Sequence, residues 1–373
     1  MESAHTPAID AFFEALLSMK GSDLHVSVGK APSVRQRGQL RGLRDRVMTQ
    51  KEAEEVLLEI LTAEQQRELD AELDLDFAYS FRDRASPSGE PRARFRASYF
   101  YKKSQDPSVA RDIGAVFRVI PAGAPTLEEL ACPPAIKKLA ESRAGLVLVT
   151  GPTGSGKSTT LAAMIRHINE TRACHILTIE DPVEFVHAPH RAEITQREVG
   201  KHAPDFATAI RSAGRENADV ILIGELRTNE TMKLALQLAS FGVLVFGTVH
   251  TNSAPATIDR ILNAFPADEQ PMVRGLLASG LTGIVAQQLV PTRDGHGRAA
   301  AHEILLGNSA LSAMIRESKT FQIPSLMQAG QNVGMQTLDM ALTRMVADGR
   351  VTKEAALEKA SDKETFVRVV SSL

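Results

Sequence analysis

One short stretch, residues 151–159, combines the residue types that bind a chain of phosphates, and it reads Gly-Pro-Thr-Gly-Ser-Gly-Lys-Ser-Thr. Glycines let successive backbone N–H groups curl around phosphate oxygens, a lysine reaches the β- and γ-phosphates, and a serine after it can ligate Mg²⁺. The stretch therefore predicts a nucleoside triphosphate site built from Gly151, Thr153, Gly154, Ser155, Gly156, Lys157, Ser158 and Thr159. A glycine-rich turn without a ligand is the alternative, and the complete motif disfavours it.

Other polar side chains suited to phosphate chemistry follow apolar runs later in the chain. Phosphoryl transfer needs a metal, neutralisation of charge and an oriented water. Glu225 follows four apolar residues, where it would hold Mg²⁺ through water or polarise the nucleophile, and Glu184 is our candidate for the general base. His250 would donate to the γ-phosphate. For Glu180 and Asp181 a turn or cap role stays open beside a catalytic one.

The segments around these groups alternate between apolar strands and helices. This alternation is typical of a mostly parallel sheet with helices on both faces, and such sheets gather ligands at the carboxyl ends of their strands. Each polar group follows a strand, so we expect the groups to converge on the phosphate loop. The predicted strands are residues 146–149, 175–179, 219–223 and 243–249, and the predicted helix after the loop is 158–167.

The first 120 residues follow a different pattern, with a higher share of alternating strands. Two prolines and a glycine within residues 121–125 then mark a linker. We therefore expect a first domain over 1–120, a linker over 121–130 and a second domain over 131–373, helical from about 305. The predicted elements are helices at 7–19, 50–61 (with Thr49 and Glu52 as a capping box) and 127–142, and strands at 24–28, 73–81, 92–101 and 115–120.

One of these strands carries three arginines on one face. Arg92, Arg94 and Arg96 occupy alternate positions, with aromatic residues at Phe95 and Tyr99. Three interpretations stay open. The arginines form a solvated basic face, or they bind single-stranded nucleic acid with the aromatic rings as stacking platforms. Alternatively, they reach the nucleotide of a neighbouring subunit and stabilise transition-state charge in trans.

The amino-acid composition narrows the class of protein and the cell compartment that we expect. A net charge of −2 over 373 residues argues against a general nucleic-acid or anionic-membrane binder. Only Cys132 and Cys174 occur, which excludes a disulfide framework and a four-cysteine zinc site and favours a reducing cytoplasm. The first 20 residues do not predict a secretory signal, and the apolar run 234–249 is too short to span a membrane. We expect membrane association only through partners.

Four motifs together resemble those of the secretion ATPases. Residues 151–159, 178–187, 223–227 and 247–254 are similar to that superfamily's Walker A, Asp-box, Walker B and His-box motifs. Within the superfamily the chain is most similar to the type IV pilus retraction ATPases. Further matching segments are 22–25, 115–121, 195–200 (Thr-Gln-Arg-Glu-Val-Gly) and 334–339, so the resemblance covers nearly the whole chain.

The resemblance implies a PAS-like α+β N-terminal domain, a RecA-like ATPase domain and a homohexameric ring with ATP and Mg²⁺ between subunits. It further implies a cytoplasmic motor at the inner membrane that turns a platform protein and so retracts type IV pili. By position, Glu184, Glu225 and His250 match the Asp-box glutamate, the Walker B glutamate and the His-box histidine. Arg227 ends the Walker B motif, Ser158 and Glu225 would serve Mg²⁺, and Arg94, Arg96 and Arg118 would be the trans arginines.

Some positions depart from the family pattern. Thr228 stands where the family usually has an acid, and Gly214 is expected to weaken or shorten the helix before the Walker B strand. Residues 310–317 match a C-terminal retraction motif only in part. An accessory or regulatory paralogue with weak turnover therefore stays open. Assembly and type II secretion ATPases usually carry a four-cysteine zinc insertion and a longer N-terminal extension, and with two distant cysteines and a short N-terminal domain we do not expect this chain to be one of them. A DNA-translocating motor would need a dense basic channel.

Overall fold

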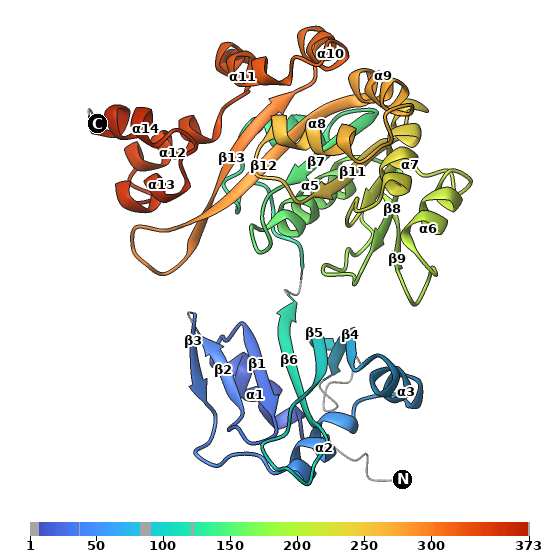
Figure 1. Cartoon of the computed structure of the whole chain (residues 1–373), viewed down its shortest axis with the longest axis vertical. Coiled ribbons are helices and arrows are strands. Elements are labelled where there is room, and N and C mark those ends of the chain that lie inside the picture. The colour runs from blue at the N-terminus through green and yellow to red at the C-terminus, as the bar shows by residue number, and fades with distance from the viewer. Residues whose placement is uncertain (1–6, 37, 83–90, 121–122, 372–373) are drawn as a thin grey trace. The chain divides into compact units, whose positions relative to one another are not determined.

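The computed structural model describes residues 7–36, 38–82, 91–120 and 123–371. The chain divides into two compact units, Met1–Ala122 and Gly123–Leu373 (Figure 1). Each unit has a sheet of its own, and the described part of each forms its own buried core. The fold is thus mixed α/β, as the sequence predicts.

The described part of the first unit is an antiparallel sheet with three helices. The strand order is β3-β2-β1-β6-β5-β4, and every pairing in it is antiparallel. The strands are β1 (Asp23–Ser27), β2 (Ser33–Gln36), β3 (Gln39–Gly42), β4 (Asp74–Arg82), β5 (Pro91–Lys102) and β6 (Asp112–Ile120). The helices are α1 (Asp10–Ser18), α2 (Gln50–Leu58) and α3 (Ala63–Glu72), and α2 starts with the predicted capping box.

Aromatic rings fill the core of this unit. Phe95 and Tyr99 are fully buried, and the Phe13 ring stacks on Phe95 with their centroids 4.3 Å apart. The Tyr99 hydroxyl donates to the carbonyl of Leu57 at 2.9 Å. Both rings are therefore unavailable to nucleobases, and the interpretation that they form stacking platforms for single-stranded nucleic acid is wrong.

The second unit is built on a seven-stranded sheet. Its order is β13-β12-β7-β11-β10-β8-β9, and all pairs are parallel except β12 with β13. The strands are β7 (Gly145–Thr150), β8 (His175–Glu180), β9 (Glu193–Glu198), β10 (Val220–Ile223), β11 (Leu244–Val249), β12 (Leu281–Pro291) and β13 (Arg298–Leu306). The parallel core matches the predicted strands.

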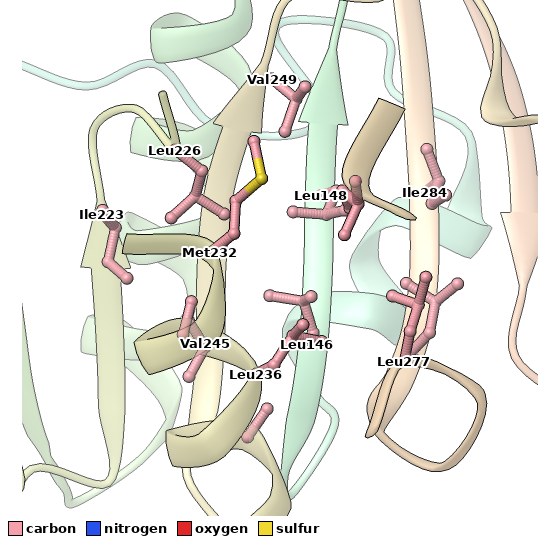
Figure 2. Packing of buried hydrophobic residues seen from close by; sticks show 14 of the residues in the cluster. Leu146, Leu148, Ile223, Leu226, Met232, Leu236, Val245, Val249, Leu277 and Ile284 are labelled. Atoms are coloured by element: carbon pink, nitrogen blue, oxygen red, sulfur yellow. The ribbon is translucent and has the colours of Figure 1, made fainter. Parts of the chain in front are cut away.

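Helices cover both faces of this sheet, because its central strands are apolar on both sides. Leu146 and Leu148 pack under one group of helices (Figure 2), whereas Val147 and Val149 pack under the other. The first face carries α6 (Phe206–Ala213), α7 (Asn229–Ser240), α8 (Ala254–Asn263) and α9 (Gln270–Gly280), and the second carries α4 (Pro134–Ala140) and α5 (Lys157–Thr171).

After β13 the regular elements that the structure describes are helices. They are α10 (Ser309–Arg316), η1 (Thr320–Gln322), α11 (Ile323–Ala329), η2 (Gln331–Val333), α12 (Leu338–Ala347), α13 (Lys353–Lys359) and α14 (Lys363–Ser371). The last three share a small core with the outer ends of β12 and β13. Within the described ranges, no helix has the length and apolar character needed to cross a membrane.

The helix predicted before the second sheet starts later than expected. The sequence predicts a helix over 127–142, but α4 begins only at Pro134. Residues 126–131 instead form a turn, in which the backbone N–H of Thr126 donates to the Glu129 carboxylate and the Thr126 hydroxyl accepts from the Glu129 N–H. The adjacent Pro133 and Pro134 explain the late start, since Pro134 lacks the N–H that a longer helix would use.

Candidate functional site

The phosphate-binding loop joins β7 to α5 in a conformation that requires glycine. Gly151 has φ of +147°, and a Cβ atom there would lie 2.3 Å from the carbonyl oxygen of Gln287. The side chain of Lys157 folds back over the loop, where its Nζ donates to the carbonyls of Gly151 at 3.0 Å and Pro152 at 3.1 Å. The amino group of Lys157 thus lies at the loop, next to the N-terminal end of α5, where anions are favoured.

Gln287 on β12 fixes this loop from the neighbouring strand, and sequence reasoning missed it. Its Nε2 donates to the carbonyl of Ser155 at 2.7 Å, and its Oε1 accepts from the Thr160 hydroxyl at 2.7 Å. The side chain is only 2% exposed. β12 pairs in parallel with β7, so Gln287 reaches the loop where β7 ends. The available signal was a pair of amides inside an otherwise apolar strand.

The parallel register brings three predicted site residues together beside the loop. Glu225 follows β10, and its Oε1 lies 2.8 Å from Nε of Arg227 and 3.2 Å from Nε2 of His250, which follows β11. The two loops are joined because the N–H of Leu226 donates to the Thr248 carbonyl at 3.0 Å. A carboxylate, a guanidinium and an imidazole therefore form one cluster at the carboxyl edge of the sheet.

The same edge carries Glu184 and Lys157. Burial lowers the pKa of Lys157, while the negative charges of Glu225 and Glu184 act in the opposite direction and raise it. Both carboxylates are thus close enough to Lys157 to influence its charge. Lys157, Glu184, Glu225, Arg227 and His250 thus lie along this edge of the sheet, and their roles in phosphoryl transfer stay a prediction.

Glu180 ends β8 at the start of the loop that carries Glu184. Its Oε1 accepts from the Thr178 hydroxyl at 2.7 Å and from Nε2 of Gln196 at 3.4 Å. Burial raises the pKa of Glu180 to about 7 against these hydrogen bonds. The Glu180 carboxyl group is thus hydrogen-bonded to its neighbours, which favours a role in the turn over direct catalysis. The neighbouring Asp181 is exposed.

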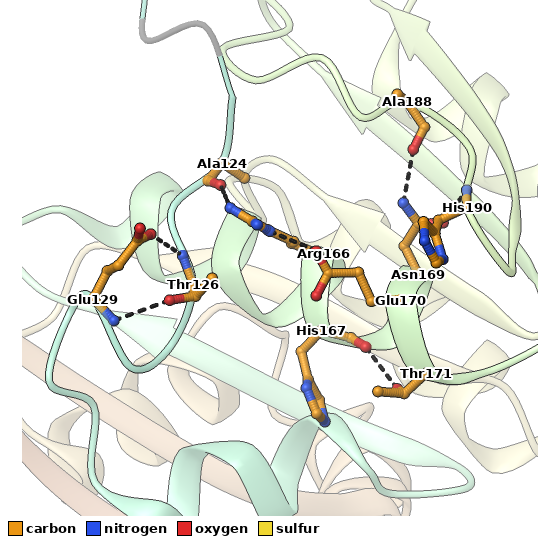
Figure 3. A network of polar contacts seen from close by, with 10 residues as sticks. All are labelled: Ala124, Thr126, Glu129, Arg166, His167, Asn169, Glu170, Thr171, Ala188 and His190. Carbon is orange, nitrogen blue, oxygen red and sulfur yellow. Dashed lines mark hydrogen bonds and ion pairs between the residues drawn. The ribbon is translucent and has the colours of Figure 1, made fainter.

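Side chains of the helix α5 also hold two other segments of the second unit (Figure 3). Arg166 Nη1 donates to the carbonyl of Ala124 at 2.7 Å, which attaches the start of the second unit to this helix. Asn169 Nδ2 donates to the carbonyl of Ala188 at 2.8 Å, and its Oδ1 accepts from the N–H of His190 at 2.9 Å. Consequently, the helix that follows the phosphate loop also fixes the far end of the Glu184 loop.

Comparison with known proteins identifies the family. A family model described as a type II/IV secretion system protein matches residues 126–329. A twitching motility protein of Neisseria gonorrhoeae is 46% identical over 335 residues, 90% of this chain and 86% of that protein. The type IV pilus retraction ATPase PilT of Pseudomonas aeruginosa is 44% identical over 345 residues, 92% of this chain and 96% of that protein.

This chain belongs to the type II/IV secretion ATPase family. Within that family it is PilT/PilU-like and an ATPase. A crystal structure of the pilus retraction motor PilT with bound ADP superimposes with a TM-score of 0.85 at 38% identity, over 96% of this chain and 99% of that one. The likeness spans both units and supports nucleotide binding by this secretion ATPase.

A cavity of about 750 Å³ lies beside the phosphate loop of this secretion ATPase. The residues that line it include Thr159 and Thr160 of α5 and three arginines, Arg293, Arg298 and Arg350. The volume falls within the range of pockets that hold small molecules. Sequence reasoning missed this cavity, because the β12–β13 turn and the α12–α13 connection that complete it carry no motif.

Two of the three candidate trans arginines, Arg96 and Arg118, have acidic partners within the first unit. Arg96 and Arg118 lie opposite each other on β5 and β6. Arg96 Nη2 lies 2.9 Å from Oδ2 of Asp76, and Arg118 Nε lies 2.9 Å from Oδ1 of Asp23. Nη1 of Arg94 is buried and has no hydrogen-bond partner among the described residues. Their trans role stays a prediction.

The two family departures near the site have local explanations. The Thr228 hydroxyl accepts from the N–H of Thr231 at 3.2 Å and caps α7, so the missing acid is replaced by an N-cap. The helix α6 ends at Ala213, directly before Gly214, as expected for a shortened helix. Neither departure removes a side chain from the cluster around Glu225.

Proposed function

We propose that this chain is an ATP-hydrolysing motor that powers type IV pilus retraction. The observation that carries the proposal is the convergence of Lys157, Glu184, Glu225 and His250 at one sheet edge, in a chain that matches PilT of Pseudomonas aeruginosa over 96% of that protein. An adaptor that only bound nucleotide would not need Glu184 as a base and Glu225 at the same edge.

Roles for the site residues follow from their positions. Lys157 and the loop amides bind the β- and γ-phosphates of ATP, and the nucleoside enters the cavity beside Thr159. Mg²⁺ suits the oxygen donors of Ser158 and Glu225, and it would neutralise phosphate charge when bound. Glu184 takes the proton of the attacking water, and His250 donates to the γ-phosphate. Arg227 orients Glu225 through their 2.8 Å contact.

We further propose that six copies form a ring, with residues 1–120 and 131–373 acting as separate domains, and that Arg94, Arg96 and Arg118 act on the neighbouring subunit's nucleotide. Rings mixed from two variants test whether each nucleotide site is shared between two subunits. A subunit with Arg96→Ala still provides a normal Lys157, and a subunit with Lys157→Ala still provides Arg96. We expect mixtures of the two to recover ATP turnover that each variant lacks alone. Mixtures as inactive as their parents would contradict shared sites.

The motor needs a partner in the membrane. The described residues contain no helix fit to cross a bilayer, and the proposed partner is an inner-membrane pilus platform protein, with the ring at the cytoplasmic face. A paralogous pilus ATPase would be a second partner. In this arrangement hydrolysis at the sheet edge drives the movement of pilin subunits through the platform protein.

Deleting the gene in its own host tests retraction against assembly. We expect mutant cells to carry more surface pili than the parent and to lose surface motility, because pili form but no longer retract. The measurement is a count of pili per cell by electron microscopy, with a complemented strain as the control. Bald cells would point to assembly, and unchanged pili with normal motility would point to an accessory paralogue or another machine.

A further inference from the structure

The loop that carries Glu184 has no strand partner of its own, yet it follows an alternating pattern. Residues 183–187 are not part of any strand or helix. Nevertheless Val183, Phe185 and His187 are buried, whereas Glu184 is only partly covered and Val186 is exposed. Such alternation is the pattern of an extended chain lying on a surface. It directs Glu184 away from the interior at the point where its charge acts on Lys157.

Side chains of β9 supply the hydrogen bonds that keep the loop extended. Glu198 Oε2 accepts from the N–H of Val183 at 3.0 Å. Gln196 Nε2 donates to the carbonyl of Phe185 at 2.9 Å, and Gln196 Oε1 accepts from the N–H of His187 at 2.9 Å. The residues directly before and after Glu184 are therefore each held by one β9 side chain.

The strand can do this because of its register and its place in the sheet. β9 is the edge strand beside β8, with Thr178 opposite Gln196 and Glu180 opposite Glu198. Gln196 and Glu198 are two residues apart, so their side chains lie on the same face of β9. The chain leaving β8 at Glu180 passes that face. Glu198 is only 5% exposed, and Lys201 pairs with its other oxygen.

We propose that Gln196 and Glu198 are positioning residues that hold Glu184 against the γ-phosphate and its attacking water. This proposal rests on the proposed role of Glu184 as general base. It gives a task to Gln196 and Glu198 of the Thr-Gln-Arg-Glu-Val-Gly segment, residues 195–200, whose other polar side chains Thr195 and Arg197 bond to His175 and Glu216. Small displacements of a catalytic group cost rate rather than affinity, because the phosphate loop binds the nucleotide independently.

Kinetics of matched variants test the proposal in the full chain. Gln196→Ala and Glu198→Ala each remove bonds next to Glu184, whereas Lys201→Ala breaks the ion pair to Glu198 and leaves its bond to Val183. We expect the first two to lower kcat by about 10- to 100-fold with KM and ATP affinity within about twofold. Lys201→Ala should keep kcat within about twofold of the unmodified chain.

Two results would overturn the proposal: normal kcat in both alanine variants, or an equal loss of kcat in Lys201→Ala, which would indicate general destabilisation. Should Gln196→Ala fail to fold, Gln196→Glu serves instead, since it retains the acceptor for His187 and loses the donor to Phe185 together with the longer bond to Glu180. The same kcat loss is expected there, and normal kcat would count against the proposal.

Hydrogen exchange separates this proposal from the assignment of Glu184. We expect the amide of His187 to exchange at least about tenfold faster in Gln196→Ala, whatever Glu184 does. If Glu184→Gln retained turnover, the base assignment would fail while the exchange result still reported on the loop. If Glu184→Gln lost turnover but Gln196→Ala kept both turnover and slow exchange, the positioning role would fail.

Discussion

Glu184→Gln is expected to bind ATP as tightly as the unmodified chain and to lose about two to four orders of magnitude in turnover. The amide is nearly isosteric with the carboxylate, but it cannot accept a proton from water. The partly exposed position of Glu184 at the sheet edge means that the substitution buries no unpaired group. Phosphate release measured at saturating ATP and Mg²⁺, together with an equilibrium titration of fluorescent ATP, checks both halves of the expectation.

A suitable control is Glu193→Gln, which makes the same chemical change at an exposed position at the start of β9. It should leave turnover unchanged. Turnover of Glu184→Gln near that of the control would assign the base elsewhere, with Glu225 as the next candidate because it shares the edge with Lys157. A parallel loss of ATP binding would instead indicate that Glu184 stabilises bound ATP before the reaction.

Lys157→Ala is expected to abolish hydrolysis, with turnover at least about 100-fold lower, and to weaken ATP binding more than ADP binding. The side chain is buried over the loop, and its ammonium group places a fixed positive charge where the β- and γ-phosphates would bind. Turnover and separate titrations with ATP and ADP measure these effects.

The control for the lysine is Lys137→Ala, which removes a lysine of α4 that forms an exposed ion pair with Glu128. Exposed pairs contribute about 0–1 kcal/mol, so this variant should fold and turn over normally. Undiminished hydrolysis in Lys157→Ala would contradict the assignment of residues 151–159 as the triphosphate site. Loss of folding in the lysine variant can be recognised from its thermal unfolding compared with Lys137→Ala.

The sequence was sufficient for those parts of the site that depend on local pattern. The loop at 151–159 and the acids after apolar strands are recognisable because each sits directly at the end of its own strand. Parallel pairing then brings the strand ends together, so the contact between Glu225 and His250 follows from the strand order.

The remaining parts depend on contacts between distant segments. Gln287 reaches Ser155 from a strand more than 130 residues later, and no local spacing encodes that pairing. Likewise, the role of Gln196 depends on β9 lying at the sheet edge beside the Glu184 loop. Phe95 was misjudged because alternation shows that two faces differ, but it does not show that the aromatic face packs against α1.

The central claim is that hydrolysis at this site drives retraction, and imaging of labelled pili tests it most directly. The gene is deleted in its host, and the strain is complemented with either the unmodified chain or Glu184→Gln at equal protein levels. We predict that retraction events per pilus return with the unmodified chain and stay absent with Glu184→Gln. Retraction at normal frequency with Glu184→Gln would contradict the account.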